Sequence, residues 1–265
     1  MVAVHNFSYG LLTPVLAYVM SCLGCFLGLR CTTRARAVQG PSRIRWLLLA
    51  AVSIGVAGIW GMHFIAMLGF SIPGQVIRYS VPVTIFSMLI AVAVVSIGLL
   101  IVGLSGDGLR PLLTGGLVIG LGVASMHYIG MSAMRMPDTM SYDIGLVVLS
   151  VIIAVVAGTL ALFAALRLDT VWSALVACLI MGVAVSGMHY TGIAALRVHT
   201  SAAAMTEGGT SASSFLVPLI VGISLLTMVL TSAISLSPTE AELRKEDEFI
   251  ERIASHHDGH AGRDS

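Results

Sequence analysis

Methionine, histidine and an aromatic residue occur side by side three times in the chain, at a nearly constant interval. Successive histidines are 64 and 62 residues apart. In the first two copies another methionine follows four residues after the histidine, which places both side chains on one helical face about 6 Å apart along the axis. The third copy has Ile193 at that position. The candidate metal ligands are Met62, His63, Met67, Met126, His127, Met131, Met188 and His189.

Imidazole nitrogen and thioether sulfur bring no formal charge, so these ligands suit a site close to lipid better than carboxylates do. Together they favour copper, particularly Cu(I), over magnesium or calcium. Haem is the alternative cofactor, because histidine and methionine are its ordinary axial ligands. Two interpretations without a cofactor are a buried hydrogen-bond layer and a pathway for protons or solutes. We expect His63, Met67, His127 and Met131 to be the primary ligands, with His189 completing or gating the site.

The elements that must position these residues are membrane helices. Of the 265 residues, 57% are hydrophobic and 10% charged, and the mean hydropathy is +0.97. A hydrocarbon core of about 30 Å is crossed by roughly 20 helical residues. The net charge of +1, without a clustered basic stripe, argues against nucleic-acid binding. Seven apolar runs lie near Gly10–Leu29, Trp46–Phe70, Pro82–Leu104, Leu112–Ser132, Ile144–Leu166, Val171–Leu196 and Phe215–Leu236.

The interval between motifs spans two helices, so the sequence predicts three tandem two-helix repeats followed by a seventh helix. The three motif helices then run in one direction, and their histidines lie at one depth. If the hairpins pack around a common axis, the histidines form one layer. We therefore expect an all-α integral membrane protein, with a seven-helix domain over residues 1–236 and a short charged tail over residues 237–265.

The distribution of basic residues predicts the orientation of the chain. Most arginines fall on one side of the predicted spans, and only Arg78, Arg135 and Arg197 fall on the other. The positive-inside rule then places the N-terminus outside and the C-terminus in the cytoplasm, in a multi-pass protein of the cell (cytoplasmic) membrane. The first segment lacks Lys and Arg before its apolar run, so no cleaved signal peptide is expected.

Other metal-binding side chains divide between the two sides. His5 and His199 fall on the predicted outer side, where they either complete the site or face water. The cysteines map to the cytoplasmic half, too deep to join the histidines, and a reducing compartment makes a disulfide improbable. The Cys22-x-x-Cys25 spacing leaves open a copper-handling or transport protein, although a role as small packing residues explains it better. The cysteines are Cys22, Cys25, Cys31 and Cys178.

The motif residues resemble the signature of the MHYT family of bacterial membrane sensors, which the third copy, Met188 to Thr191, spells in full. The resemblance covers roughly residues 5–236. It implies a sensory membrane domain that binds copper through Met and His and senses oxygen, carbon monoxide or nitric oxide. In that family, cytoplasmic cyclase, phosphodiesterase or kinase modules often follow. Phe64 and Ile193 depart from the pattern by removing one tyrosine and one distal methionine.

These observations predict a non-catalytic sensor that reports to a separate cytoplasmic signalling protein. No Ser-His-Asp set, phosphate-binding loop or carboxylate pair supports an enzyme. The lipid bilayer is an obligatory partner, and a diatomic gas is a candidate ligand. In the tail, residues 240–253 predict a short amphipathic helix at the membrane surface. His256, His257 and His260 follow it in a His-rich end.

Overall fold

The computed structural model describes residues 5–73, 75–106, 108–136, 139–199, 209–212 and 214–236. Within these residues it contains seven helices long and apolar enough to cross a membrane, which confirms the predicted fold class. The second of them is continuous but is divided into α2, the π-helical segment η1 and α3. The helices are α1 (Leu12–Ala37), α2 (Gly40–Val52), η1 (Ser53–Gly61), α3 (Met62–Leu68), α4 (Val81–Ser105), α5 (Leu109–Ser132), α6 (Ile144–Arg167), α7 (Val171–Ala194) and α8 (Leu216–Leu236).

The first six membrane helices form a closed ring in chain order. Each helix packs against the next along the chain, and α7 returns to pack against α1. The second helices of the three repeats also contact one another across the ring, through α3, η1, α5 and α7. Helix α8 lies outside the ring against α1 and η1. The predicted tandem hairpins and separate seventh helix are therefore confirmed.

Glycine allows neighbouring helices to approach closely. A Cβ atom on Gly24 of α1 would meet the backbone nitrogen of Gly58 in η1 and would lie 2.6 Å from its Cα. On the far side of the ring, a Cβ on Gly120 of α5 would meet the Cα of Val155 in α6. Backbones in contact gain dispersion energy that lipid chains cannot offer to the separated helices.

The helix that bears the first motif copy differs from the others in its backbone. Nine residues just before Met62 form η1, whose hydrogen bonds span five residues in place of four. The segment contributes Trp60, which is fully buried and donates from Nε1 to the Thr84 carbonyl and the Ser87 hydroxyl, both at 3.1 Å. These bonds attach η1 to α4 within the membrane.

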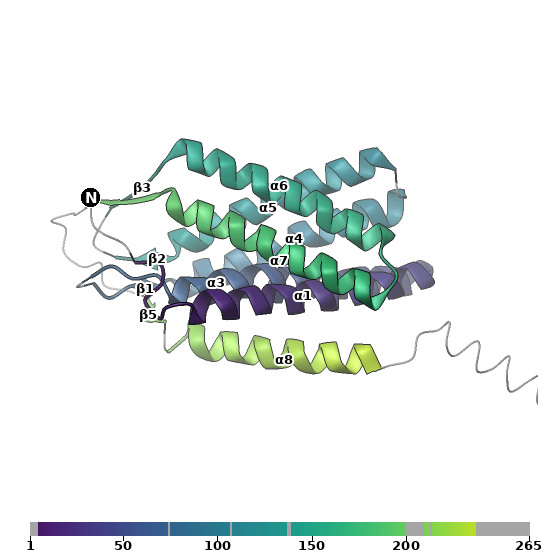
Figure 1. Cartoon of the computed structure of the whole chain (residues 1–265), viewed down its shortest axis with the longest axis horizontal. Coiled ribbons are helices and arrows are strands. Elements are labelled where there is room, and N and C mark those ends of the chain that lie inside the picture. The colour runs from purple at the N-terminus through teal and green to yellow at the C-terminus, as the bar shows by residue number, and fades with distance from the viewer. Residues whose placement is uncertain are drawn as a thin grey trace, which may run out of the picture.

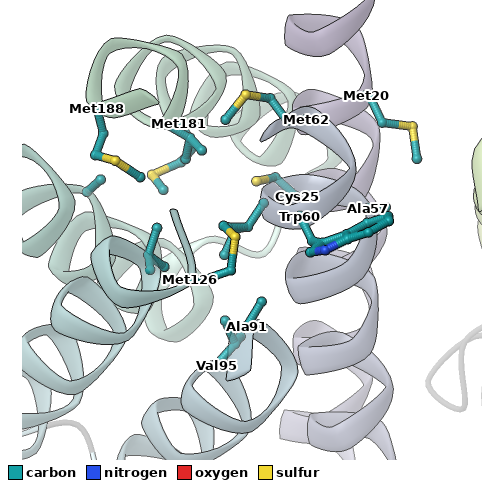
Figure 2. Close-up of a cluster of buried hydrophobic side chains, with 14 of the residues drawn as sticks. Met20, Cys25, Ala57, Trp60, Met62, Ala91, Val95, Met126, Met181 and Met188 are labelled. Atoms are coloured by element: carbon teal, nitrogen blue, oxygen red, sulfur yellow. The ribbon is translucent and has the colours of Figure 1, made fainter. Parts of the chain in front are cut away.

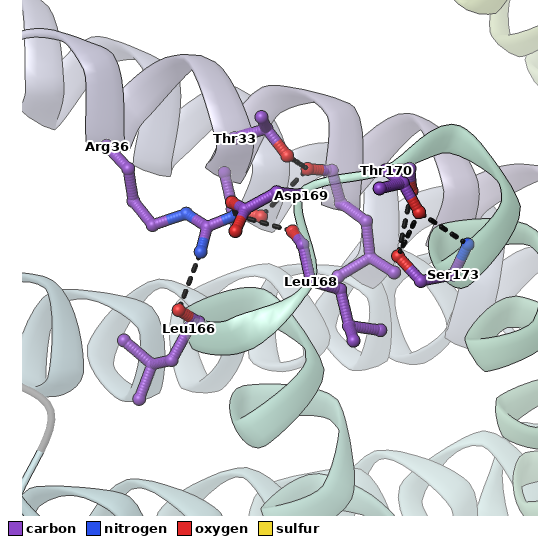
Figure 3. A network of polar contacts seen from close by, with 9 residues as sticks. Thr33, Arg36, Leu166, Leu168, Asp169, Thr170 and Ser173 are labelled. Atoms are coloured by element: carbon purple, nitrogen blue, oxygen red, sulfur yellow. Dashed lines mark hydrogen bonds and ion pairs between the residues drawn. The ribbon is translucent and has the colours of Figure 1, made fainter.

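The first helix is longer than predicted, because α1 continues past Leu29 to Ala37. Its last turns carry arginines that bind carbonyl groups of other helices, so the helix remains paired after the apolar run ends. Arg36 donates to the Leu166 carbonyl in the last turn of α6 at 2.6 Å, and to the Leu168 carbonyl just beyond α6 at 2.5 Å (Figure 3). It also forms an ion pair with Asp169 at 2.7 Å. We call this the arginine end.

Short strands connect the repeats at the opposite end of the ring, which we call the strand end (Figure 1). All pairings are antiparallel, with β2, β1 and β5 in one sheet and β3 and β4 in another. A bridge between His5 and Ser71 joins the N-terminal segment to the first connection. The strands are β1 (Arg78–Tyr79), β2 (Met134–Arg135), β3 (Thr139–Tyr142), β4 (Leu196–His199) and β5 (Thr210–Ser211).

The tail lies outside the described residues. Its predicted helix over residues 240–253 and the histidines His256, His257 and His260 therefore stay predictions.

Candidate metal centre

The three motif histidines meet at the centre of the ring. His63 of α3, His127 of α5 and His189 of α7 are fully buried, and their ligand nitrogens all lie within 4.8 Å of one another. The Nδ1 atom of His63 is 3.0 Å from that of His189 and 3.2 Å from that of His127. Each repeat supplies one imidazole, so the predicted single layer is confirmed.

The imidazole rings are arranged edge to face, with each plane nearly perpendicular to the other two. Their centroids are 4.9 to 5.1 Å apart, and the interplanar angles are 79° to 89°. The Nε2 atoms of all three rings are buried and have no hydrogen-bond partner among the described residues. Within the described residues, the polar contacts of these rings therefore run through Nδ1, and those of His127 and His189 both meet that of His63.

Hydrogen bonds among the histidines can pair the three Nδ1 atoms only if His127 and His189 share one atom of His63. A neutral imidazole has one N–H, so each Nδ1 is either a donor or an acceptor. Both contacts fall on Nδ1 of His63, so the single N–H or lone pair of that atom must serve His127 and His189 at once. A cation bound where the three lone pairs meet would let all three act as ligands. The donor set therefore fits a metal ion better than a hydrogen-bond layer.

The spacing also fits an ion. For metal–nitrogen bonds of about 2.0–2.1 Å, trigonal or tetrahedral geometry separates the nitrogens by about 3.3–3.6 Å. The observed 3.0 and 3.2 Å are within a few tenths of an ångström of that range. The acidic side chains in the described part of the chain are Asp143 and Asp169, both at helix ends, so the ligands of the site are neutral.

The predicted methionine ligands are all buried, but they lie on different sides of the histidine layer. Met62, Met126 and Met188 belong to a buried cluster with Cys25 and Met181 (Figure 2). Met188 lines a cavity inside the ring, towards the arginine end. Met67 lines a separate pocket near the strand end, and Met131 is fully buried. The histidines are thus brought together, whereas ligation by methionine sulfur stays a prediction.

An outer set of aromatic pairs surrounds the histidines at the strand end. The aromatic residue of each motif packs on a ring from a connecting segment: Phe64 on Tyr79, Tyr128 on Tyr142 and Tyr190 on Phe7, with centroids 5.5 to 6.2 Å apart. Burial raises the pKa of Tyr79 and of Tyr142, so both phenols stay neutral at physiological pH. Because Phe7 belongs to the N-terminal segment, this third pair closes the ring between its first and last repeats.

Two glycines that the sequence analysis missed complete the packing of the histidines. A Cβ on Gly130 would lie 2.6 Å from Nε2 of His63, and a Cβ on Gly192 would meet Nε2 of His127. Both glycines stand three residues after a motif histidine, where the first copy has Ala66. Alignment of the three copies on their histidines would have revealed this small residue.

The remaining histidines and cysteines stay separate from this centre within the described residues. His5 and His199 are exposed at the strand end, and His199 binds the Ser141 hydroxyl at 3.0 Å. The four cysteines are free. Cys22 donates to the Cys178 carbonyl at 3.5 Å, while Cys25 lines the cavity inside the ring. Neither thiol belongs to the histidine cluster.

Known proteins are similar to this chain over its repeat region. The family model MHYT, described as a bacterial signalling protein N-terminal repeat, matches residues 57–115 and 120–178. Among curated proteins, the chain is 37% identical over 237 residues to the cyclic di-GMP phosphodiesterase NbdA of Pseudomonas aeruginosa. It is 32% identical over 242 residues to the bifunctional diguanylate cyclase/cyclic di-GMP phosphodiesterase MucR of the same organism. No solved structure matches it.

These matches cover most of this chain and a smaller part of the relatives. They include 87% of this chain and 29% of NbdA, and 89% of this chain and 35% of MucR. The signalling protein YkoW of Bacillus subtilis is 29% identical over 191 residues, which are 69% of this chain and 24% of YkoW. The chain thus spans about a third or less of the length of these relatives.

Proposed function

Because the chain belongs to the MHYT family of bacterial membrane signalling proteins, we propose that it is a membrane sensor built around a single copper ion. The ion is held by Nδ1 of His63, His127 and His189. The observation that carries this proposal is the meeting of three buried imidazoles, one from each repeat, with the Nδ1 atoms of His127 and His189 both within 3.2 Å of Nδ1 of His63. When bound, copper supplies a redox-active centre with affinity for diatomic gases.

Copper is preferred to other ions because the surrounding side chains are soft and neutral. Met62, Met126 and Met188 each precede a ligand histidine, and thioether sulfur favours Cu(I) over harder cations. Haem fits the geometry less well, because its wide planar ring cannot lie between imidazoles whose Nδ1 atoms are 3.0 Å apart. Retention of the ion is favoured over its transport, because the cavity beneath the histidines is walled almost entirely by apolar side chains.

The proposed signal is oxygen, carbon monoxide, nitric oxide or a change in redox state. These gases dissolve in lipid, so they reach a site inside the bundle without an aqueous pore. A change at the three histidines alters the packing of α3, α5 and α7, which bear them. Since the curated relatives are named as cyclic di-GMP enzymes, the proposed output is control of a cytoplasmic enzyme of that class, while this chain is itself non-catalytic.

Metal analysis of the purified chain tests the proposal. We expect about one copper ion per wild-type chain by elemental analysis, and a visible spectrum without haem bands. Replacing His63, His127 or His189 by Asn removes a ligand and is expected to abolish most of the bound copper. His199→Asn changes an exposed histidine and serves as the matched control, with copper retained. A metal-free wild type, or copper binding that survives all three histidine replacements, contradicts the proposal.

A further inference from the structure

A cavity of about 50 Å³ lies inside the ring, between the histidine layer and the arginine end. All six helices of the repeats contribute to its wall, while α8 does not. Figure 2 shows part of this wall, in which Cys25 of α1, Val95 of α4 and the pair Met181 and Met188 of α7 come from different helices. The cavity is therefore a product of the closed ring.

The walls offer nothing to hold water. Apart from the thiol of Cys25, the lining consists of aliphatic side chains, methionine and glycine. An ordered water needs two to four polar partners, and cavities with apolar walls stay dry and bind apolar guests such as xenon. The volume suits one atom or molecule of the size of xenon or dioxygen. A lipid acyl chain is much larger, so it does not fit.

The cavity adjoins the proposed metal centre along two helices. Ile59 lines the cavity and His63 follows it by four residues, which is about one turn in a helix. On α7, Met188 lines the cavity and His189 is the next residue. A guest in the cavity therefore lies next to the helix turns that bear His63 and His189, on the side towards the arginine end.

We propose that this cavity binds one apolar, diatomic-sized gas molecule, such as dioxygen, directly beneath the histidine layer. The biological role of this gas rests on the proposed sensor function, whereas the binding follows from the size and chemistry of the walls. Gas dissolved in the bilayer enters between lipid-facing helices and is concentrated next to the centre. Occupancy also fills a void in the core, so it stabilises the closed packing of the six helices.

Xenon is the probe for this site, because it is apolar and of the right size. With methionine methyl groups labelled by ¹³C in the full chain, we expect the resonances of Met181 and Met188 to shift saturably with xenon pressure. Met228 of α8 is 53% exposed towards the lipid side and provides the internal control. Its methyl resonance is expected to change only linearly, through xenon dissolved in the surrounding lipid or detergent.

Two matched pairs of variants on α7 test whether xenon binds in this cavity. Val185 is buried and lines the cavity, whereas Val183 is 63% exposed on the outer face. Val185→Phe fills the void and is expected to weaken xenon binding by about tenfold or more, while Val183→Phe leaves it unchanged. If Val185→Phe fails to fold, Val185→Ile adds one methylene and is expected to weaken binding about threefold. Val183→Ile is its control.

The outcomes separate this site from the metal centre. Equal responses of Met188 and Met228 in the wild type, or saturable binding retained in folded Val185→Phe, overturn the cavity site. Saturable xenon binding by a copper-free wild type supports the cavity and counts against the metal centre. Bound copper retained in Val185→Phe, together with lost xenon binding, shows that the cavity is a separate site with its own ligand.

Discussion

At the scale of residues, the glycine three positions after a motif histidine leaves room for the imidazole of another repeat and so limits where that ring can lie. Gly130 faces His63, and Gly192 faces His127, so the second and third repeats each shape the surroundings of the histidine in the preceding repeat. In most metal sites, the second ring nitrogen of a ligand histidine donates to an acceptor, and this hydrogen bond orients the ring. In this chain, contact with glycine takes the place of that hydrogen bond. Here the orientation depends on steric fit, because the Nε2 atoms have no hydrogen-bond partner among the described residues.

The variant Gly192→Ala tests this steric role. Its Cβ would meet Nε2 of His127 and would lie 2.9 Å from Cδ2, so the ring must shift. We expect an overpacking penalty of about 1–3 kcal/mol and a loss of copper affinity of about 10–100-fold, as for other losses of support around a metal ligand. Thermal unfolding and copper titration of the purified chain measure the two effects.

Gly187→Ala is the matched control on the same helix. A Cβ at Gly187 meets nothing within 4 Å, and alanine favours a helix over glycine by about 1 kcal/mol. We expect unchanged copper affinity and equal or higher stability. Equal copper affinities for Gly187→Ala and Gly192→Ala would show that glycine contact does not position the imidazole.

At the scale of elements, the crossing of α1 and η1 depends on one glycine more than on its partner. A Cβ on Gly24 would enter the backbone of Gly58, whereas a Cβ on Gly58 would lie 3.4 to 3.6 Å from its nearest neighbours, which is ordinary contact. The asymmetry arises because the two Cα–Cβ directions differ, and only that of Gly24 is aimed at the other backbone. The two glycines therefore have different tolerance for a side chain.

We predict that Gly24→Ala destabilises the protein and Gly58→Ala does not. The first substitution separates two packed helices and is expected to lower the free energy of unfolding by about 1–3 kcal/mol or more. The second is expected to change it by less than about 1 kcal/mol. Thermal unfolding in a fixed detergent compares the two variants, and equal destabilisation would refute the asymmetric crossing.

The helices and their repeat were predictable because their signals are long and local. Seven apolar runs determine the seven spans, and the nearly constant spacing of His63, His127 and His189 determines the repeat and the common depth. The extension of α1 to Ala37 was not predictable from hydropathy, because it depends on Arg36 reaching carbonyl groups on α6. The π-helical geometry of η1 likewise depends on packing that periodicity does not encode.

The centre was predictable in its residues but not in its geometry. The sequence identified the three histidines, and the structure brings all three into one buried cluster, while the ranking of His63 and His127 above His189 as ligands stays a prediction. The choice of Nδ1 as the converging atom depends on ring rotamers, which follow from contacts with Gly130 and Gly192. Those contacts join residues of different repeats, so no local pattern contains them.

At the scale of the whole molecule, the two ends of the ring differ in charge. The arginines of α1, α2, α5 and α6 lie at the arginine end, while Arg78, Arg135 and Arg197 lie at the strand end. A bundle with this asymmetry is expected to insert with the arginine end in the cytoplasm. The histidine layer then lies in the outer half of the membrane, because the motifs stand late in helices that run outwards.

Cysteine labelling tests this orientation in cells. In a background with the four native cysteines replaced, Ser141→Cys places a thiol at the strand end and Thr170→Cys places one at the arginine end, both at exposed positions. An impermeant maleimide applied to intact cells is expected to label position 141 and to spare position 170. Both should react after permeabilisation, which controls for accessibility. The reverse pattern in intact cells would invert the predicted topology.

The closed ring also fixes when the centre can exist during biosynthesis. His63 and His189 are separated by 126 positions, and the ring closes only when α7 packs against α1. A growing chain therefore carries its first histidine into the membrane long before the third ligand has been synthesised. Loading of the proposed metal ion would therefore have to follow the docking of the last hairpin, and a chain that stops before α7 would lack one of its three histidines.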